Sequence, residues 1–339
     1  MKVLFNCHVP FMLAHGGAQI QIEQTKVALE RAGLEVEPLR WWDPAQSGDV
    51  LHHFGRIPTN VLQLAQQKGM KVVMSPFMSG VGARPAWARF LHRMILKAVR
   101  PVAPEAIRLT FGWGSYLLAD ACIAMTPFEA SLMTKIFNTP PERVHVVPNG
   151  VEEVFLKSDP ESGAERGKWL VCTAAIIELK QVLKLAEMAV KAQTPIWFIG
   201  KAYAKADHYT KRFEDFARQH REIIRYEGPI AERARLAGIY RRARGFVLLS
   251  RWESLSLSAL EAAACKCPLL LSDLPWAREA FKEKASYCPH DGSVHSSARI
   301  LQSFYDAAPN LEPPPQPMSW SDVARQLKTV YESLLTTSR

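Results

Sequence analysis

The sequence predicts an α/β protein of two domains, each a parallel sheet with helices on both faces. The chain has 339 residues, which is enough for two domains that each bury a core. Short apolar runs alternate with helical patterns along its whole length, and this alternation is typical of parallel sheets. A charged, polar stretch at 152–167 interrupts the alternation, which then starts again.

The first domain, residues 1–151, is expected to begin with an apolar strand at 3–7, a glycine-containing loop and a helix at 19–32. Two helical stretches precede residue 120, and a Pro-Asn-Gly-Val turn closes the domain. The other predicted strands are 35–39, 49–54, 71–75, 120–125 and 144–147, and the other helices are 59–67 and 127–137.

The second domain, residues 168–318, follows the expected linker at 152–167, where Ser-Asp-Pro and Ser-Gly sequences break regular structure. Residues 319–339 carry an N-cap Asp and apolar side chains at helical spacing, which predicts a terminal helix. The strands of the second domain are predicted at 170–174, 196–200, 223–226, 246–250 and 269–271, with helices between them.

The composition is that of an ordinary globular protein, with 48% apolar residues and a formal net charge of +9. No apolar run approaches the ~20 residues of a membrane-spanning helix, and the N-terminus is too short in apolar residues for a signal peptide. The positive charge suits phosphorylated substrates or an anionic membrane. Nucleic acid ranks low, because zinc spacing, helix-turn-helix signals and basic runs with aromatics are missing. The six scattered cysteines indicate buried thiols in a reducing cytoplasm.

Residues 245–271 are predicted to form a strand, a loop, a helix and a second strand. The loop thus follows the carboxyl end of a strand, where open α/β sheets bind their ligands. Backbone N–H groups at 255–257 would face an anion such as a diphosphate. Glu253 in the loop and Glu261 on the helix are separated by seven residues, a spacing that also arises by chance. A carboxylate at each end of an anion site suits the recognition of hydroxyl groups.

This stretch resembles the Glu-x7-Glu signature of the retaining glycosyltransferases with the GT-B fold, called group 1 or family 4. The resemblance covers nearly the whole chain and implies two Rossmann-like domains facing a cleft, with the terminal helix packing back toward the first domain. It implies that Glu253 contacts the donor sugar and Glu261 the nucleotide ribose. Without the resemblance, both residues would be ordinary solvated glutamates.

The segment 173–181 resembles the loop after the first strand of the family's second domain, which usually carries an Arg and a Lys five residues later. Lys180 matches the Lys, whereas Ala175 stands at the Arg position. Lys180 would then neutralise the donor diphosphate with helix-end amides, or with Lys201 or Arg251 in place of the missing Arg. As a plain solvated lysine at a helix start, Lys180 would be mildly unfavourable against the helix dipole.

The remaining donor contacts come from glycines and loop residues. Gly16 and Gly17 precede a helix, where glycine lets backbone amides approach an anion, although a plain tight turn explains them equally well. The resemblance places them beside the donor phosphates and the acceptor. It also places Ile230 beside the nucleotide base. Residues Ser254, Leu255 and Ser256 complete the expected donor set.

The acceptor side has weaker signals. The loop at 75–80 lacks the His or Asp that many family members carry there. His15, His52 and His53 are candidates to face the cleft, as is Asn149, although a His between apolar strand residues is more often packed. In a retaining transferase the leaving phosphate can itself deprotonate the acceptor, so a protein base is dispensable.

Residues 85–100 form an amphipathic helical pattern, with no acidic residue from 84 to 100. Arg89, Arg93 and Lys97 line one side. Two interpretations stay open for the segment from Trp87 to Arg100: a core-packed helix with a solvated basic side, or an interfacial helix on anionic lipid. The apolar face consists of Trp87, Phe90, Leu91, Met94, Ile95, Ala98 and Val99.

The residues and the resemblance together predict a retaining glycosyltransferase of polysaccharide or glycoconjugate biosynthesis, with Lys180 and Glu253 as catalytic groups. It would move a sugar from a nucleotide sugar to a glycan, lipid-linked or protein acceptor. No cofactor and no metal are expected, because an Asp-x-Asp in a suitable loop is missing. The alternatives are a GT-B sugar-nucleotide epimerase and a non-catalytic partner subunit. The expected location is the cytoplasm, with peripheral attachment to the inner face of the membrane open.

Overall fold

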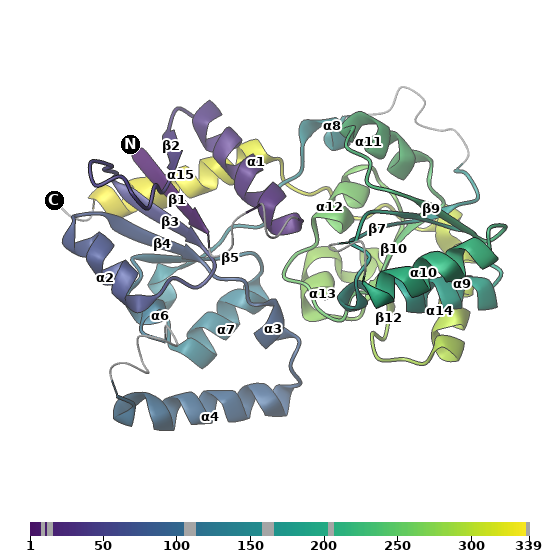
Figure 1. Cartoon of the computed structure of the whole chain (residues 1–339), viewed down its shortest axis with the longest axis horizontal. Helices are drawn as coiled ribbons and strands as arrows, with labels where there is room; N and C mark the ends of the chain where they lie inside the picture. The colour runs from purple at the N-terminus through teal and green to yellow at the C-terminus, as the bar shows by residue number, and fades with distance from the viewer. Residues whose placement is uncertain (8–10, 12–15, 105–112, 158–165, 203–206, 337–339) are drawn as a thin grey trace. The chain divides into compact units, whose positions relative to one another are not determined.

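The computed structural model describes residues 1–7, 11, 16–104, 113–157, 166–202 and 207–336. The chain divides into two compact units. The first unit holds Met1–Asn149 together with Trp320–Arg339, and the second holds Gly150–Ser319. Each is a six-stranded parallel sheet with helices around it, which confirms the predicted two Rossmann-like α/β domains (Figure 1).

The sheet of the first unit has the strand order β2-β1-β3-β4-β5-β6, and every neighbouring pair is parallel. Its central strands are mostly apolar because helices cover both faces, and all five residues of β3 are buried, His52 and His53 included. The strands are β1 (Lys2–Cys7), β2 (Glu35–Pro38), β3 (Val50–Phe54), β4 (Lys71–Ser75), β5 (Ala121–Ala124) and β6 (Val144–Val146).

The long helices of the first unit lie near their predicted ranges, and the short helices α3 and α6 are additional. Helix α7 (Pro127–Phe137) begins because the hydroxyl of Thr126 accepts the N–H of Glu129, and it ends at Asn138, whose φ is 58°. The others are α1 (Gly17–Arg31), α2 (Thr59–Gln67), α3 (Ser79–Gly82), α4 (Ala86–Val102), α6 (Ser115–Leu118), α15 (Trp320–Thr336) and the short 3₁₀ turn η1 (Pro141–Arg143).

Helix α15 belongs to the first unit although it follows the second in the chain. The ammonium of Lys328 donates to the carbonyl oxygen of Ala32 at 3.1 Å, at the end of α1. The hydroxyl of Tyr331 lies 2.6 Å from Nδ1 of His52 on β3, and both side chains are buried. The terminal helix therefore covers one face of the first sheet.

The second sheet has the order β12-β11-β10-β7-β8-β9 and is also entirely parallel. Five of its strands match predicted ones, and the short edge strand β12 was not predicted. The strands are β7 (Leu170–Thr173), β8 (Ile196–Ile199), β9 (Ile224–Glu227), β10 (Gly245–Leu248), β11 (Leu269–Ser272) and β12 (Ser286–Cys288).

The core of the second unit lies between this sheet and its helices, with Phe198, Phe213 and Phe246 fully buried. One short helix, α8 (Glu153–Leu156), forms inside the stretch that was expected to be a linker. The other helices are α9 (Val182–Lys191), α10 (His208–Gln219), α11 (Arg233–Arg242), α12 (Leu257–Ala264), α13 (Pro275–Phe281) and α14 (Val294–Ala307). The 3₁₀ turns are η2 (Glu178–Lys180), η3 (Lys282–Lys284) and η4 (Ala308–Asn310).

Candidate functional site

The topology of the second sheet marks one place for a ligand. From β7 the chain adds β8 and β9 on one side, then crosses over and adds β10, β11 and β12 on the other. The strand order therefore reverses between β7 and β10, and open α/β sheets bind ligands at the carboxyl ends of such strands. The loops that leave β7 and β10 touch there, since the N–H of Arg251 donates to the carbonyl oxygen of Leu179 at 2.9 Å.

These two loops bring Lys180 and Glu253 into an ion pair. The side chains are 21% and 14% exposed, so the pair is largely shielded from solvent. The hydroxyl of Ser250 donates a second hydrogen bond, of 2.7 Å, to the same carboxylate oxygen. The structure thus joins the two residues for which the sequence predicts catalytic roles.

The position of Lys180 depends on the turn that follows it. Gln181 has φ 49° and separates the 3₁₀ turn η2 from helix α9. Its side-chain amide donates to the carbonyl oxygen of His290 at 3.0 Å, and the ammonium of Lys184 donates to the same oxygen, also at 3.0 Å. The lysine therefore projects from a turn that two side chains hold against the segment after β12.

Helix α12 begins at the same edge of the sheet. Ser256 is its N-cap, and its hydroxyl accepts the N–H of Ala259 at 3.4 Å. The hydroxyl oxygen of Ser254 is buried without a hydrogen-bond partner among the described residues. A buried hydroxyl without a partner is costly, so this group is suited to bind a ligand. Leu255 and Ser256 are buried between it and the helix.

Glu261 lies one turn further along the chain on α12 and is buried, with its side chain 7% exposed. The guanidinium of Arg233, on α11, donates to its carboxylate and also to that of Glu152, at 2.7 Å. The same guanidinium lies over the ring of Phe155, 4.7 Å from its centroid. Glu261 is therefore not a solvated residue on a helix surface.

The burial of Glu261 changes its proton affinity. Desolvation raises the pKa of this carboxyl, and the adjacent Arg233 opposes the rise, so that the pKa is about 6. Arg233 and Glu152 are not among the residues that the sequence predicts for this site. Their only signal is the position of Arg233 at the start of a helix three residues after Ile230, which is too common to identify a partner of Glu261.

Two cations lie near Ala175, which stands at the position where the family usually carries an Arg. Ala175 lies in the loop after β7, and the guanidinium of Arg251 lies 3.0 Å from Glu178 in the same loop. Lys201 is exposed, and its carbonyl oxygen accepts the N–H of Ile176 at 3.0 Å. Both proposed substitutes thus border the loop of Lys180. Ile230 is half-buried between β9 and α11, and its contact with a base stays a prediction.

The first candidates in the first unit are the two glycines before and at the start of α1. Gly16, with φ 146°, is the N-cap of α1, and Gly17 is the first residue of that helix. The backbone at Gly16 therefore has a conformation that favours glycine, while His15 lies outside the described residues.

His52 is buried with both ring nitrogens facing partners, and its acceptor-side role stays a prediction. His52 is 1% exposed, and its Nε2 lies 2.7 Å from the hydroxyl of Ser75 while its Nδ1 faces Tyr331. Desolvation lowers its pKa to about 3. Its neighbour on the strand, His53, is 2% exposed, and Asn149 is 5% exposed. Their acceptor-side roles stay predictions.

No group of three or more His, Cys, Asp or Glu side chains that could hold a metal ion occurs within the described ranges. Within the same ranges, no helix is long and apolar enough to cross a membrane.

Comparisons with known proteins show which sequences and folds this chain is similar to. Residues 168–306 match the family model described as glycosyl transferases group 1. A D-inositol 3-phosphate glycosyltransferase of Catenulispora acidiphila is 27% identical over 256 residues, which are 65% of this chain and 59% of that protein. The enzyme of the same name from Thermobispora bispora is 27% identical over 52% of this chain and 45% of its own length. The chain thus spans about half the length of these relatives.

Solved structures share the fold of the whole chain. Sucrose-phosphate synthase from Thermosynechococcus elongatus superimposes with a TM-score of 0.71 at 16% identity, over 99% of this chain and 100% of that one. HepE of Anabaena, solved in complex with UDP, gives 0.66 at 12% identity over 98% and 100%. The lipopolysaccharide outer core galactosyltransferase WaaB gives 0.61 at 14% identity over 97% and 100%. Residues 168–306 of this chain are thus similar to the group 1 glycosyltransferases, and the whole chain shares the fold of these solved structures.

Proposed function

We propose that this protein transfers a sugar from a nucleotide sugar to an acceptor, with retention of the anomeric configuration. The observation that carries the proposal is the ion pair of Lys180 and Glu253 where the strand order reverses, beside the N-terminus of α12. A cation, a carboxylate and the N-terminus of a helix in one place suit a ligand that has both a diphosphate and hydroxyl groups.

In this proposal the diphosphate takes the place of Glu253 as the partner of Lys180. The cation then stabilises the negative charge that develops on the diphosphate as the bond to the sugar breaks. Glu253 is released to accept hydrogen bonds from sugar hydroxyls, while Ser250 keeps its bond to the carboxylate. The unpartnered hydroxyl of Ser254 and the amides at the start of α12 complete the donor site.

Glu261 is assigned to the ribose, together with Arg233. Because Arg233 already binds two carboxylates, it can hold Glu261 in its ionised form while a ribose hydroxyl donates to the second oxygen of that carboxylate. Arg251 is the substitute for the family Arg, since it lies in contact with the loop of Lys180. No metal is assigned a role.

UDP is the first nucleotide to test, because similar folds have been solved with UDP or UDP-glucose bound. Calorimetry should detect binding of UDP to the wild type, and Lys180→Met should weaken it at least tenfold, since a charged hydrogen bond contributes about 1.5–3 kcal/mol. Lys211→Met on the exposed side of α10 is the matched control and should bind as the wild type does.

The reaction itself is tested with a panel of UDP-sugars and with glycan, lipid-linked and protein acceptors. NMR of the product reads the configuration of the new bond, and an inverted product would contradict the proposed retention. Release of UDP with water alone and a changed sugar would indicate an epimerase. Tight UDP binding with no turnover on any acceptor would indicate a non-catalytic subunit.

A further inference from the structure

Helix α4 has the opposite orientation from that of an ordinary amphipathic helix on a protein surface. Its apolar face points away from the first unit, and the narrow opposite side, with Arg89, His92 and Leu96, packs against that unit. Leu96 is the inward residue, 5% exposed, whereas Trp87 is 69% and Val102 78% exposed. The core-packed interpretation of this segment is therefore wrong for its apolar face.

The contacts of the inner side explain how the helix is held. His92 packs edge-on against Phe137 of α7, with ring centroids 5.8 Å apart. The guanidinium of Arg89 lies 5.2 Å from the ring centroid of Phe128 and donates to the carbonyl oxygens of Gly82 and Arg84, at 3.1 and 2.7 Å. These bonds fix the rotation of α4 about its axis. They leave the apolar face outward.

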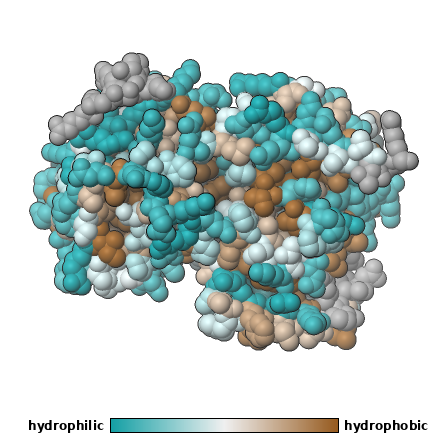
Figure 2. Space-filling model, turned by 180° about the vertical axis from the view of Figure 1, so that it is seen from behind, coloured by the Kyte–Doolittle hydropathy of each residue, from teal (hydrophilic) through white to brown (hydrophobic). Residues whose placement is uncertain are grey.

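The outward face is large and continuous. Seven large apolar side chains repeat at helical spacing over four turns, and each is at least 37% exposed. In Figure 1, α4 lies at the bottom of the first unit and runs along the side of α7 that faces away from the sheet. In Figure 2, the view from behind, brown and tan residues line the bottom edge of the same unit. The face consists of Trp87, Phe90, Leu91, Met94, Ile95, Val99 and Val102.

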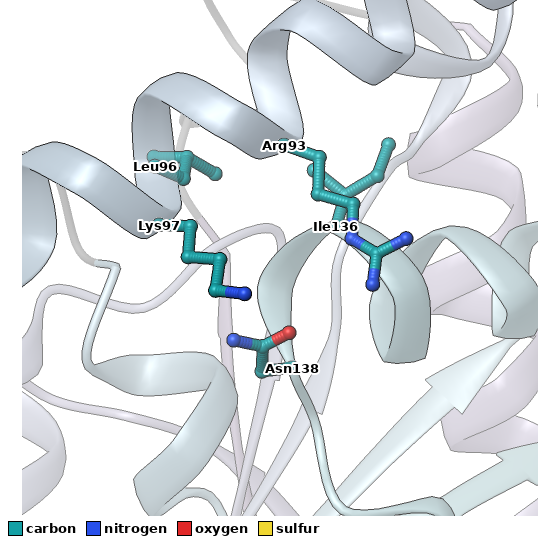
Figure 3. A pocket seen from close by; sticks show the side chains of 5 residues that line it. All are labelled: Arg93, Leu96, Lys97, Ile136 and Asn138. Carbon is teal, nitrogen blue, oxygen red and sulfur yellow. The ribbon is translucent and has the colours of Figure 1, made fainter.

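A basic pocket lies beside this face, between α4 and the end of α7. It has a volume of about 240 Å³, with the buried side chains of Leu96 and Ile136 in its wall. In Figure 3, Lys97 extends from α4 toward Asn138 at the end of α7, and Arg93 extends from α4 beside Ile136. Within the described part of the chain, neither cation forms an ion pair with a carboxylate. The pocket is therefore polar, positively charged and open to an anion.

We propose that α4 docks the protein on an anionic lipid bilayer, with its apolar face among the acyl chains and a lipid phosphate in the pocket of Arg93, Lys97 and Asn138. A helix that lies in a bilayer interface needs an apolar side toward the lipid and cations at the level of the head groups. Here the cations flank the apolar face, and residues 84–100 contain no acid that would repel the surface. The charge favours a lipid surface over an apolar protein partner. The inference does not depend on sugar transfer.

The first test is co-sedimentation of the purified protein with vesicles. Vesicles with about 30% phosphatidylglycerol should bind it at low salt, neutral phosphatidylcholine vesicles should bind it at least tenfold more weakly, and binding should fall steeply toward about 0.5 M salt. The double variant Trp87→Ser, Phe90→Ser should lose binding. Trp42→Ser is the control, because Trp42 is 95% exposed in the same unit but outside α4. All the changed side chains are exposed, so thermal unfolding should be unaffected.

The second test addresses the pocket. Arg93→Gln with Lys97→Gln should weaken binding to anionic vesicles at least tenfold, whereas Arg31→Gln, an exposed cation on α1, should not. Sodium phosphate should compete no better than sodium chloride of equal ionic strength, because the site is assigned to a lipid phosphate anchored by its chains. Stronger competition by phosphate would reassign the pocket to a free phosphate compound.

Two outcomes would overturn the docking proposal. One is a wild-type protein that ignores anionic vesicles at low salt. The other is a dimer in sedimentation that Trp87→Ser dissociates, since the apolar face would then be covered by a second copy of the chain.

Discussion

Lys180 and Glu253 form an ion pair across 73 residues of sequence. Among the ion pairs of the described residues, neither has another partner of opposite charge. The pair is possible because β7 and β10 are neighbours in the sheet, so the loops at their carboxyl ends meet. A ligand diphosphate would have to compete with Glu253 for the lysine. The affinity of the site for nucleotide therefore depends on both residues.

This competition predicts opposite effects of two substitutions. Glu253→Gln removes the carboxylate that neutralises Lys180, so UDP affinity should stay equal or rise severalfold. Turnover should fall by at least a hundredfold, because the sugar loses a charged acceptor, worth about 1.5–3 kcal/mol per hydrogen bond. Calorimetry and initial rates measure the two effects. A parallel loss of UDP affinity would mean that Glu253 contacts the nucleotide and not the sugar.

Arg251 and Ala175 should behave as alternatives in supplying one cation. Ala175→Arg restores the residue usual in the family and should preserve or raise UDP affinity. Arg251→Gln should lower UDP affinity in the wild type, and by less when Arg is present at position 175. The double-mutant cycle isolates this coupling, which should be about 0.5–3 kcal/mol. Strictly additive changes would show that Arg251 does not substitute for the missing Arg.

Glu261 should make stability depend on pH. Its pKa is raised from 4.5 to about 6 in the folded protein, so between these values the folded state holds a proton that the unfolded state has lost. Stability from this group is therefore highest below about pH 4.5 and falls as the pH rises through 6, by about 2 kcal/mol.

Urea denaturation of the wild type and of Glu261→Gln across this range measures that effect, because the contributions of the other carboxyls cancel in the difference. The wild type should lose stability relative to the Gln variant as the pH rises, and the difference should level off above pH 7. A difference that does not change with pH would mean that Arg233 fully offsets the burial of the carboxylate.

Tyr331 should hold the terminal helix on the first unit through His52. Tyr331→Phe removes the hydroxyl that faces Nδ1 of the buried imidazole, so unfolding should become easier by about 1–3 kcal/mol. Tyr305→Phe in the second unit is the control, since Tyr305 is only partly buried. UDP binding should be unchanged in both. An unchanged stability of Tyr331→Phe would mean that water replaces the lost bond.

The elements that could be predicted from sequence are those with a local cause. Helix α7 has its predicted bounds because Thr126 caps its start and Asn138 adopts the left-handed conformation at its end. Four strands of the second sheet, β7, β8, β10 and β11, are mostly apolar runs. The edge strand β12 was missed because three residues, Ser286–Cys288, are too short and too polar for such a pattern.

The sequence by itself determined the alternation of strands and helices, hence two parallel sheets, and it indicated the loops where charged residues follow strands. The partners of those residues were decided by the tertiary structure. Lys180 meets Glu253, and Arg233 meets Glu261, because the strand order places distant loops and helices together. For α4, the spacing of apolar residues shows that the helix has an apolar face. Which side packs was decided by Arg89, His92 and Leu96, whose contacts with the first unit turn that face outward.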